Sequence, residues 1–123
     1  MTRGTTHTHI VTTPFVVDTV AEVLIAFKQE NAEIVRKVTP DCIMSGNTIS
    51  VNLTQEETFR FTDKRKARSQ ARVLLKDGTV WASPVVVEDV GECLTNDVLE
   101  LGVTPSGEVA TLGTAILDSA KLG

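Results

Sequence analysis

The chain has 123 residues, enough for one domain, and 41% of them are hydrophobic, which argues against wholesale disorder and for a self-supporting core. Only 4% are aromatic and none is Tyr, so a carbohydrate platform or a base-stacking surface is disfavoured. The net charge of −4 disfavours non-specific nucleic-acid binding, and no apolar run suits a signal peptide or a membrane-spanning helix, so we expect a soluble protein made in a cytoplasm.

The first third of the chain predicts three strands. Residues 7–17 are rich in Thr and Val and predict a strand, which Pro14 confines to a sheet edge or a bend because proline cannot donate to a central ladder. In residues 20–27, Val, Ile and Phe recur at every second position, as in a strand with one buried face. A turn at residues 31–32 then leads into a strand over residues 33–38.

The middle of the chain predicts one more strand and a short helix. Residues 46–53 begin with a Gly-Asn turn and continue with alternating apolar and polar side chains. Thr54 and Glu57 have the spacing of a capping box, in which each side chain accepts from the backbone N–H of the other residue. We therefore predict one or two helical turns after Thr54, with Phe59 or Phe61 filling the core.

A hairpin is the clearest pattern in the chain. Small or apolar residues alternate with mostly charged ones over residues 67–76, and Asp77-Gly78 separates this strand from an apolar run over residues 80–90. Together with the earlier strands, it predicts an all-β fold, an immunoglobulin-like antiparallel β-sandwich of about six or seven strands. The disulfide signature of immunoglobulin domains is missing, so this fold prediction depends on the number and spacing of the strands.

The pattern changes towards the C-terminus. We assign residues 1–94 to the sandwich and residues 95–123 to an extended C-terminal segment, which glycine and proline interrupt repeatedly. Within that segment, residues 98–103 and 108–112 could form a small hairpin, and residues 115–122 could form a helical turn or two. The segment is either an assembly arm that docks on a neighbouring subunit or the completion of the chain's own sandwich.

Charge is distributed unevenly along the chain. Six of the twelve basic residues fall between Lys64 and Lys76. The residues after Gly78 carry seven acidic side chains and one basic side chain, Lys121. This asymmetry could orient subunits against each other, or it could mark two solvated faces of opposite charge.

Few residues have a pattern that suggests chemistry. His7 and His9 share one side of a predicted strand, which suits two metal ligands, but no third ligand is evident nearby, so we expect exposed histidines and predict no metal site. The adjacent carboxylates at residues 56–57 have a capping role, and we find no phosphate loop, serine elbow or Cys/His dyad. Cys42 and Cys93 lack redox spacing and are expected to be free, buried thiols in a reducing cytosol, although they could pair in an oxidising compartment. We therefore predict no catalytic residue, no cofactor and no enzymatic activity.

The remaining candidates are residues for contact with other proteins. Lys64, Arg65, Lys66, Arg68 and Arg72 form a basic cluster. This cluster could bind an anionic partner or could form a solvated strand edge. Trp81 could fill the core or anchor an interface. The candidate interface residues are Arg3, Lys64, Arg65, Lys66, Arg68, Trp81, Val98, Leu99, Leu101, Val109, Leu112, Ile116, Leu117 and Leu122.

Ordered motifs along residues 3–94 resemble a known family. They are Arg-Gly-Thr-Thr at 3–6, Gly-Asn-Thr-Ile-Ser-Val at 46–51, Leu-Thr-Gln-Glu-Glu-Thr at 53–58, Phe61, Gln70, Arg72 and Val73, Asp-Gly at 77–78, Ala-Ser at 82–83, and residues 90–94. In this order and spacing they resemble the N-terminal immunoglobulin-like domain of baseplate upper proteins, from phages that infect gut Firmicutes. The resemblance implies a β-sandwich without catalytic residues that docks onto other structural proteins of a tail tip or baseplate.

We therefore expect a non-catalytic structural protein of a bacteriophage particle, of the tail or baseplate type. Its expected partners are other virion structural proteins and further copies of itself, with no nucleic acid and no membrane, and its expected place is the virion. Two alternatives stay open, a capsid decoration or head accessory protein and a free-standing adhesion or ligand-binding sandwich. An adhesion module would need an exposed aromatic platform, for which one Trp and four Phe offer little material.

Overall fold

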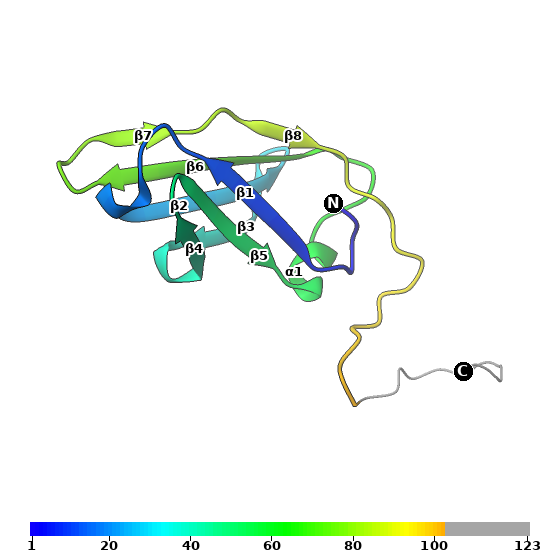
Figure 1. The fold of residues 1–123 in the computed structure, drawn as a ribbon. Helices are drawn as coiled ribbons and strands as arrows, with labels where there is room; N and C mark the ends of the chain where they lie inside the picture. The colour runs from blue at the N-terminus through cyan, green and yellow to red at the C-terminus, as the bar shows by residue number, and fades with distance from the viewer. Residues whose placement is uncertain (103–123) are drawn as a thin grey trace.

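Two antiparallel β-sheets face each other in the computed structural model, which describes residues 1–102 (Figure 1). One sheet has the order β1-β5-β4; the other has the order β3-β2-β6-β7, and β8 follows β7 along the same edge of β6. The strands are β1 (His7–Thr12), β2 (Val20–Gln29), β3 (Ala32–Val38), β4 (Cys42–Ser45), β5 (Thr48–Leu53), β6 (Ala67–Leu75), β7 (Val80–Ala82) and β8 (Val86–Glu88). Two 3₁₀ helices, η1 (Val17–Thr19) and η2 (Thr39–Asp41), and the short helix α1 (Gln55–Phe59) lie between strands. The predicted all-β antiparallel sandwich is confirmed.

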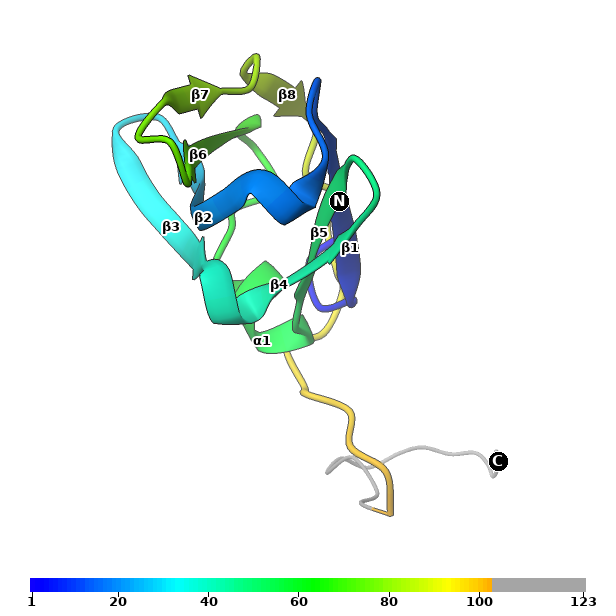
Figure 2. The same ribbon diagram turned by 60° about the vertical axis from the view of Figure 1, so that its left-hand side comes forward.

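The hydrophobic core lies between the two sheets, which Figure 2 separates into two layers. Side chains alternate between the two faces of a strand, so the apolar positions of β2, β5 and β6 all point into this space. The most deeply buried side chains are Ile25, Phe27, Val35, Ile49, Val51, Leu53, Phe61, Ala67, Ala71 and Val73.

The first strand is shorter than predicted. β1 ends at Thr12, and the Thr13 hydroxyl donates to the carbonyl of Phe15 at 2.6 Å. This hydrogen bond turns the chain, so Pro14 lies outside the strand pairing. β1 lies at the edge of its sheet, where its unpaired side tolerates this bend. The chain then enters η1, so the predicted strand over residues 7–17 is wrong in its second half.

Two of the three predicted hairpin turns are confirmed in place. Gly46 and Gly78 adopt φ values of +58° and +92°, the left-handed region that glycine enters without strain. The turn between β2 and β3 lies one residue earlier than predicted, because Gln29 pairs with Ala32 and leaves Glu30 and Asn31 as the loop. Glu30 adopts φ +53°, so a residue with a Cβ occupies the strained position.

The apolar run over residues 80–90 forms two short strands instead of one. Its pairing with β6 shifts by one residue between β7 and β8. At the break, the Ser83 hydroxyl accepts from the backbone N–H of Ala71 at 2.9 Å and replaces a carbonyl of the ladder. This division, together with the unpredicted β4, gives eight strands in residues 1–102 where six or seven were expected.

The capping box is confirmed. The Thr54 hydroxyl accepts from the Glu57 N–H at 3.2 Å, and a Glu57 carboxylate oxygen accepts from the Thr54 N–H at 2.9 Å. Phe61 fills the core at 1% exposure, whereas Phe59 is half-buried. The predicted hairpin over 98–112 and the predicted helical turns over 115–122 lie wholly or partly outside the described residues.

Candidate functional site

One face of the five-stranded sheet is left without a covering layer in residues 1–102. Its members are outward-pointing side chains of β2, β3, β6 and β7 and of the break between β7 and β8. We call this surface the outer sheet face and define it as Leu24, Ala26, Val38, Gln70, Arg72, Leu74, Val80 and Val85. The valines at 38, 80 and 85 are 42%, 53% and 50% exposed. Shallow grooves run over Leu24, and Figure 2 shows no helix lying over this side of the sheet. Gln70 and Arg72 of β6 lie among these apolar side chains, and exposed apolar surface bordered by polar residues is typical of an interaction site.

Basic side chains border the outer sheet face. Lys28 and Arg68 line the same groove as Leu24 and Arg72. Arg36, farther along the sheet, is held by both oxygens of Glu33, at 2.9 and 3.0 Å. Lys28 and Arg72 make no ion pair with another residue of the described range. Lys28 and Arg68 therefore place positive charge along one border of the apolar side chains, which we call the basic rim, while Glu22 lines a neighbouring groove over Leu24.

The predicted basic cluster is partly neutralised by residues of this chain. Arg65 pairs with Glu30, Lys66 pairs with Asp89, and an Arg68 nitrogen donates to the Glu30 carbonyl at 2.8 Å. All three contacts are exposed and contribute little to stability. Lys64 lies exposed in the loop before β6. Of this cluster, Arg68 and Arg72 on β6 reach the outer sheet face.

Trp81 packs inward. Its ring meets that of Phe15 edge to face, with 5.4 Å between the ring centroids, and both residues pack against the core. The side chain is half-buried. This position matches the core-filling interpretation of Trp81, and the contact with Phe15 removes the largest ring from any exposed platform.

Arg3 fixes the N-terminal segment to the domain. Its guanidinium donates to the carbonyls of Phe61 and Phe59, at 2.6 and 3.1 Å, and lies 5.5 Å from the centre of the Phe59 ring. The neighbouring Gly4 has φ +76°, and a Cβ there would lie 2.5 Å from a Phe59 ring carbon. Arg3 therefore makes two hydrogen bonds and one contact with an aromatic ring inside this chain.

The segment after β8 carries exposed leucines among acidic residues. Leu94 and Leu101 are almost completely exposed, and Leu99 is 61% exposed. The Leu99 backbone N–H donates to the Gln55 side chain at 2.9 Å, which ties the segment to α1 while its side chain points to solvent. Val98 is half-buried. Glu92, Asp97 and Glu100 are exposed between these apolar residues. The other candidate residues, Val109, Leu112, Ile116, Leu117 and Leu122, lie outside the described range.

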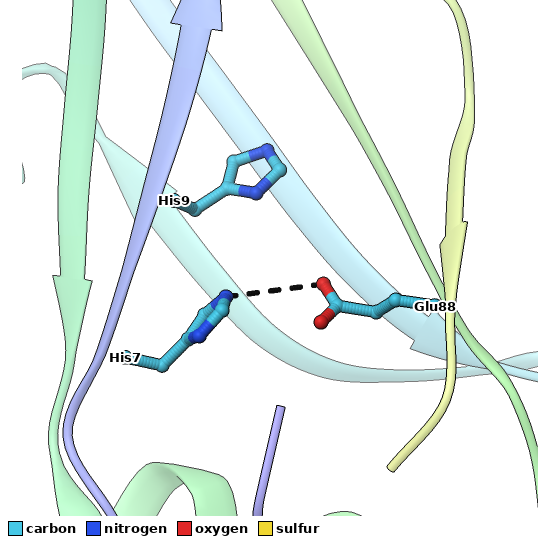
Figure 3. Close-up of side chains that lie close together, drawn as sticks. All are labelled: His7, His9 and Glu88. Atoms are coloured by element: carbon cyan, nitrogen blue, oxygen red, sulfur yellow. Dashed lines mark ion pairs between the residues drawn. The ribbon is translucent and has the colours of Figure 1, made fainter.

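The two histidines meet a carboxylate that the sequence did not suggest. His7 and His9 project from β1 towards Glu88 of β8, and one ligand atom of each residue lies within 4.8 Å of the others (Figure 3). His7 Nε2 is 3.8 Å from a Glu88 carboxylate oxygen. Glu88 was not predicted, because local sequence patterns do not indicate which edges of two sheets face each other.

His9 is buried, which corrects the expectation of two exposed histidines. It is 8% exposed, and its ring stands edge-on to Phe27 with 5.2 Å between the centroids. Burial lowers the pKa of His9 below its ordinary value; the negative charge of Glu88 opposes this effect and His7 adds to it. The imidazole of His9 is therefore neutral at pH 7.

Both cysteines are free thiols and half-buried. Burial raises the pKa of the Cys42 thiol, with a smaller contribution from Asp41 that exceeds the opposing effect of Lys37. A raised pKa keeps Cys42 protonated and poorly nucleophilic at neutral pH. Both side chains were expected to be buried, and the structure leaves each of them half-buried.

Within residues 1–102, no helix has both the length and the apolar character needed to cross a membrane. No family model matches the chain, and no curated protein has a matching sequence.

Proposed function

We propose that this domain is a non-catalytic structural protein of a bacteriophage particle, of the tail or baseplate type, that works by assembling with other proteins. The observation that carries the proposal is the outer sheet face, an apolar surface with a basic rim and no covering layer in residues 1–102. The resemblance of residues 3–94 to baseplate upper proteins supplies the setting.

The partner that fits this face best is the acidic segment over residues 92–102 of a second copy. That segment offers exposed leucines for the apolar centre and carboxylates for the basic rim. The two surfaces differ, so the contact is heterologous and propagates from copy to copy into a ring or an open array. Such repetition suits a structural protein of a symmetric particle.

The adhesion alternative has less support. An adhesion sandwich of this kind needs exposed rings, and Trp81 and Phe15 are occupied with each other against the core. The capsid alternative shares the fold and the assembly role, and only its place on the particle differs.

Multi-angle light scattering of the full-length protein over a range of concentrations tests the assembly step. The Val80→Glu variant places a charge in the apolar centre, and Ile43→Glu is the matched control, because Ile43 is 60% exposed on the outer side of the other sheet. We expect the wild type and Ile43→Glu to associate with rising concentration, more weakly at high salt, and Val80→Glu to stay monomeric. A wild type that is strictly monomeric and does not bind isolated virion proteins would refute the proposal.

Immunogold labelling of purified particles tests the setting. Label confined to the tail tip supports the tail assignment, and label over the head favours a capsid decoration protein. Gene order gives an independent check, since neighbouring tape-measure and tail genes favour the tail and a neighbouring major capsid gene favours the head.

A further inference from the structure

The edges of the two sheets approach each other on one side of the sandwich. In the described residues, β1 pairs with β5 only and β8 pairs with β6 only, so no backbone ladder joins β1 to β8. His7 and His9 on β1 and Glu88 on β8 span this side, and Figure 3 shows the three side chains converging from the two strands. The backbone joins the two edges just outside these strands, where the Arg3 N–H donates to the Gly91 carbonyl at 3.0 Å and the Gly91 N–H donates to the Met1 carbonyl at 2.7 Å. Three groups capable of metal ligation therefore meet beside this connection, between strands that do not pair with each other.

The spacing of the three groups is close to that of a metal site. Zinc bonds of about 2.1 Å in a tetrahedral arrangement place the ligand atoms about 3.4 Å apart. His7 Nε2 and the Glu88 oxygen are 3.8 Å apart, and all three ligand atoms lie within 4.8 Å of one another. Small side-chain rotations are enough to close the site, since β1 holds both histidines on one face.

We propose that His7, His9 and Glu88 bind a divalent transition-metal ion, with Zn²⁺ as the reference ion, and that this ion ties the β1 edge to the β8 edge. Two imidazoles and one carboxylate form a donor set that suits Zn²⁺, Co²⁺ or Ni²⁺ and disfavours Mg²⁺ and Ca²⁺, which prefer oxygen ligands. The fourth position is open to water or to a donor from a partner.

The surroundings of each donor support ligation. His9 is 8% exposed as a residue, and within residues 1–102 no hydrogen bond occupies either of its ring nitrogens, which leaves them free to bind a metal. The Phe27 ring fixes the His9 ring from the side. The Met1 amino group donates to one Glu88 oxygen at 3.0 Å, which orients the carboxylate and leaves its other oxygen facing His7.

Isothermal titration of Zn²⁺ into the full-length protein tests the proposal. The protein is purified without a histidine tag and begins at its own Met1, because the amino group contacts Glu88. We expect one saturable site per chain and a rise of roughly 10 °C in the unfolding midpoint at a hundredfold excess of Zn²⁺ over its Kd. Co²⁺ in place of Zn²⁺ is expected to give the visible absorption of a tetrahedral site.

Three variants decide whether the binding belongs to this cluster. His7→Asn and Glu88→Gln each remove one donor and are expected to bind Zn²⁺ at least about tenfold more weakly. Glu56→Gln is the matched control, because Glu56 is an exposed carboxylate outside the cluster and outside the segment over residues 92–102. If one of these two variants fails to fold in EDTA, the other still tests the site, because the two residues lie on different strands. The His7 side chain is 26% exposed, so its replacement disturbs the packing little.

Two results would overturn the proposal. One is a wild type that binds no Zn²⁺ saturably. The other is equal Zn²⁺ affinity in the wild type, Glu56→Gln, His7→Asn and Glu88→Gln, which would place the ion elsewhere. Neither result bears on the outer sheet face, so the metal proposal and the assembly proposal fail independently.

Discussion

Glu57 joins α1 to the five-stranded sheet through two sets of contacts. One carboxylate oxygen caps the N-terminus of α1 by accepting from the Thr54 N–H at 2.9 Å. Both oxygens also accept from the Lys37 ammonium of β3, at 2.8 and 2.9 Å. The side chains of Lys37 and Glu57 are 12% and 17% exposed, so this ion pair is shielded from water far more than an ordinary surface pair.

The Glu57→Ala substitution is expected to lower the free energy of unfolding by about 2–4 kcal/mol. Loss of the cap accounts for about 0.5–2 kcal/mol, and Lys37, left as a mostly buried charge without its partner, accounts for about 1–3 kcal/mol. Thr54→Ala removes only the cap and is expected to cost about 1 kcal/mol. Glu56→Ala, in the same helical turn but exposed, is the matched control and is expected to change stability by less than about 0.5 kcal/mol.

Urea unfolding followed by Trp81 fluorescence measures these differences, because Trp81 is the chain's one tryptophan and is half-buried beside Phe15. The variants are compared with the wild type only where the slope of the unfolding free energy against urea concentration is the same, as expected for two-state unfolding in each protein. If Glu57→Ala costs no more than Glu56→Ala, the assignment of the Lys37–Glu57 contact as a stabilising link is refuted.

The same residue predicts a pH dependence. Burial raises the pKa of Glu57, but the hydrogen bonds from Lys37 and the Thr54 N–H, with the charges of Lys37 and Arg60, outweigh it and hold the pKa below its ordinary value of 4.5. The contribution of the carboxylate is thus complete above pH 4.5 and is lost as the pH falls towards the depressed pKa. The stability difference between the wild type and Glu57→Gln is therefore expected to shrink below pH 4.5, and an unchanged difference would contradict the reasoning.

Two further pairs of variants test the packing of the sandwich. The Ser69 hydroxyl is buried without a hydrogen-bond partner in residues 1–102, so Ser69→Ala is expected to raise stability by about 1 kcal/mol; Ser83→Ala, which removes the acceptor of the Ala71 N–H, is expected to lower it by about 1–2 kcal/mol. Urea midpoints that move in the same direction for both serine variants would count against this account. Gly4→Ala combines strain at φ +76° with a clash against Phe59, whereas Gly46→Ala has φ +58° and open space around it. Thermal unfolding is expected to show a loss for Gly4→Ala that exceeds that of Gly46→Ala by about 1–3 kcal/mol, and equal losses would show that the clash relaxes freely.

Local patterns predicted local structure well. The alternation over residues 67–76, the Asp77-Gly78 turn and the Thr54–Glu57 capping box each depend on residues a few positions apart, and each occurs in the structure. The error in the predicted end of the first strand has a local cause. The hydrogen bond from the Thr13 hydroxyl to the Phe15 carbonyl turns the chain in a segment whose composition favours a strand.

Features that depend on distant contacts were not predictable. The His7–His9–Glu88 cluster exists because the edge of one sheet lies next to the edge of the other, and no spacing along the chain encodes that meeting. The outer sheet face had a partial signal in the apolar residues at 24, 74 and 80, but the alternation alone did not say which face of the sheet would be covered. The inward position of Trp81 likewise depends on Phe15, a neighbour from another part of the fold.

The division of the residue 80–90 run has a consequence for how this edge of the sheet can meet another chain. An unbroken strand at this edge would present a continuous row of free backbone groups to any other chain, which is the template from which fibrils grow. Instead, β7 and β8 have three residues each, with a register shift and Pro84 between them. Growth of a fibril through this edge is thereby interrupted after a few residues, whatever face the domain uses to bind its partners.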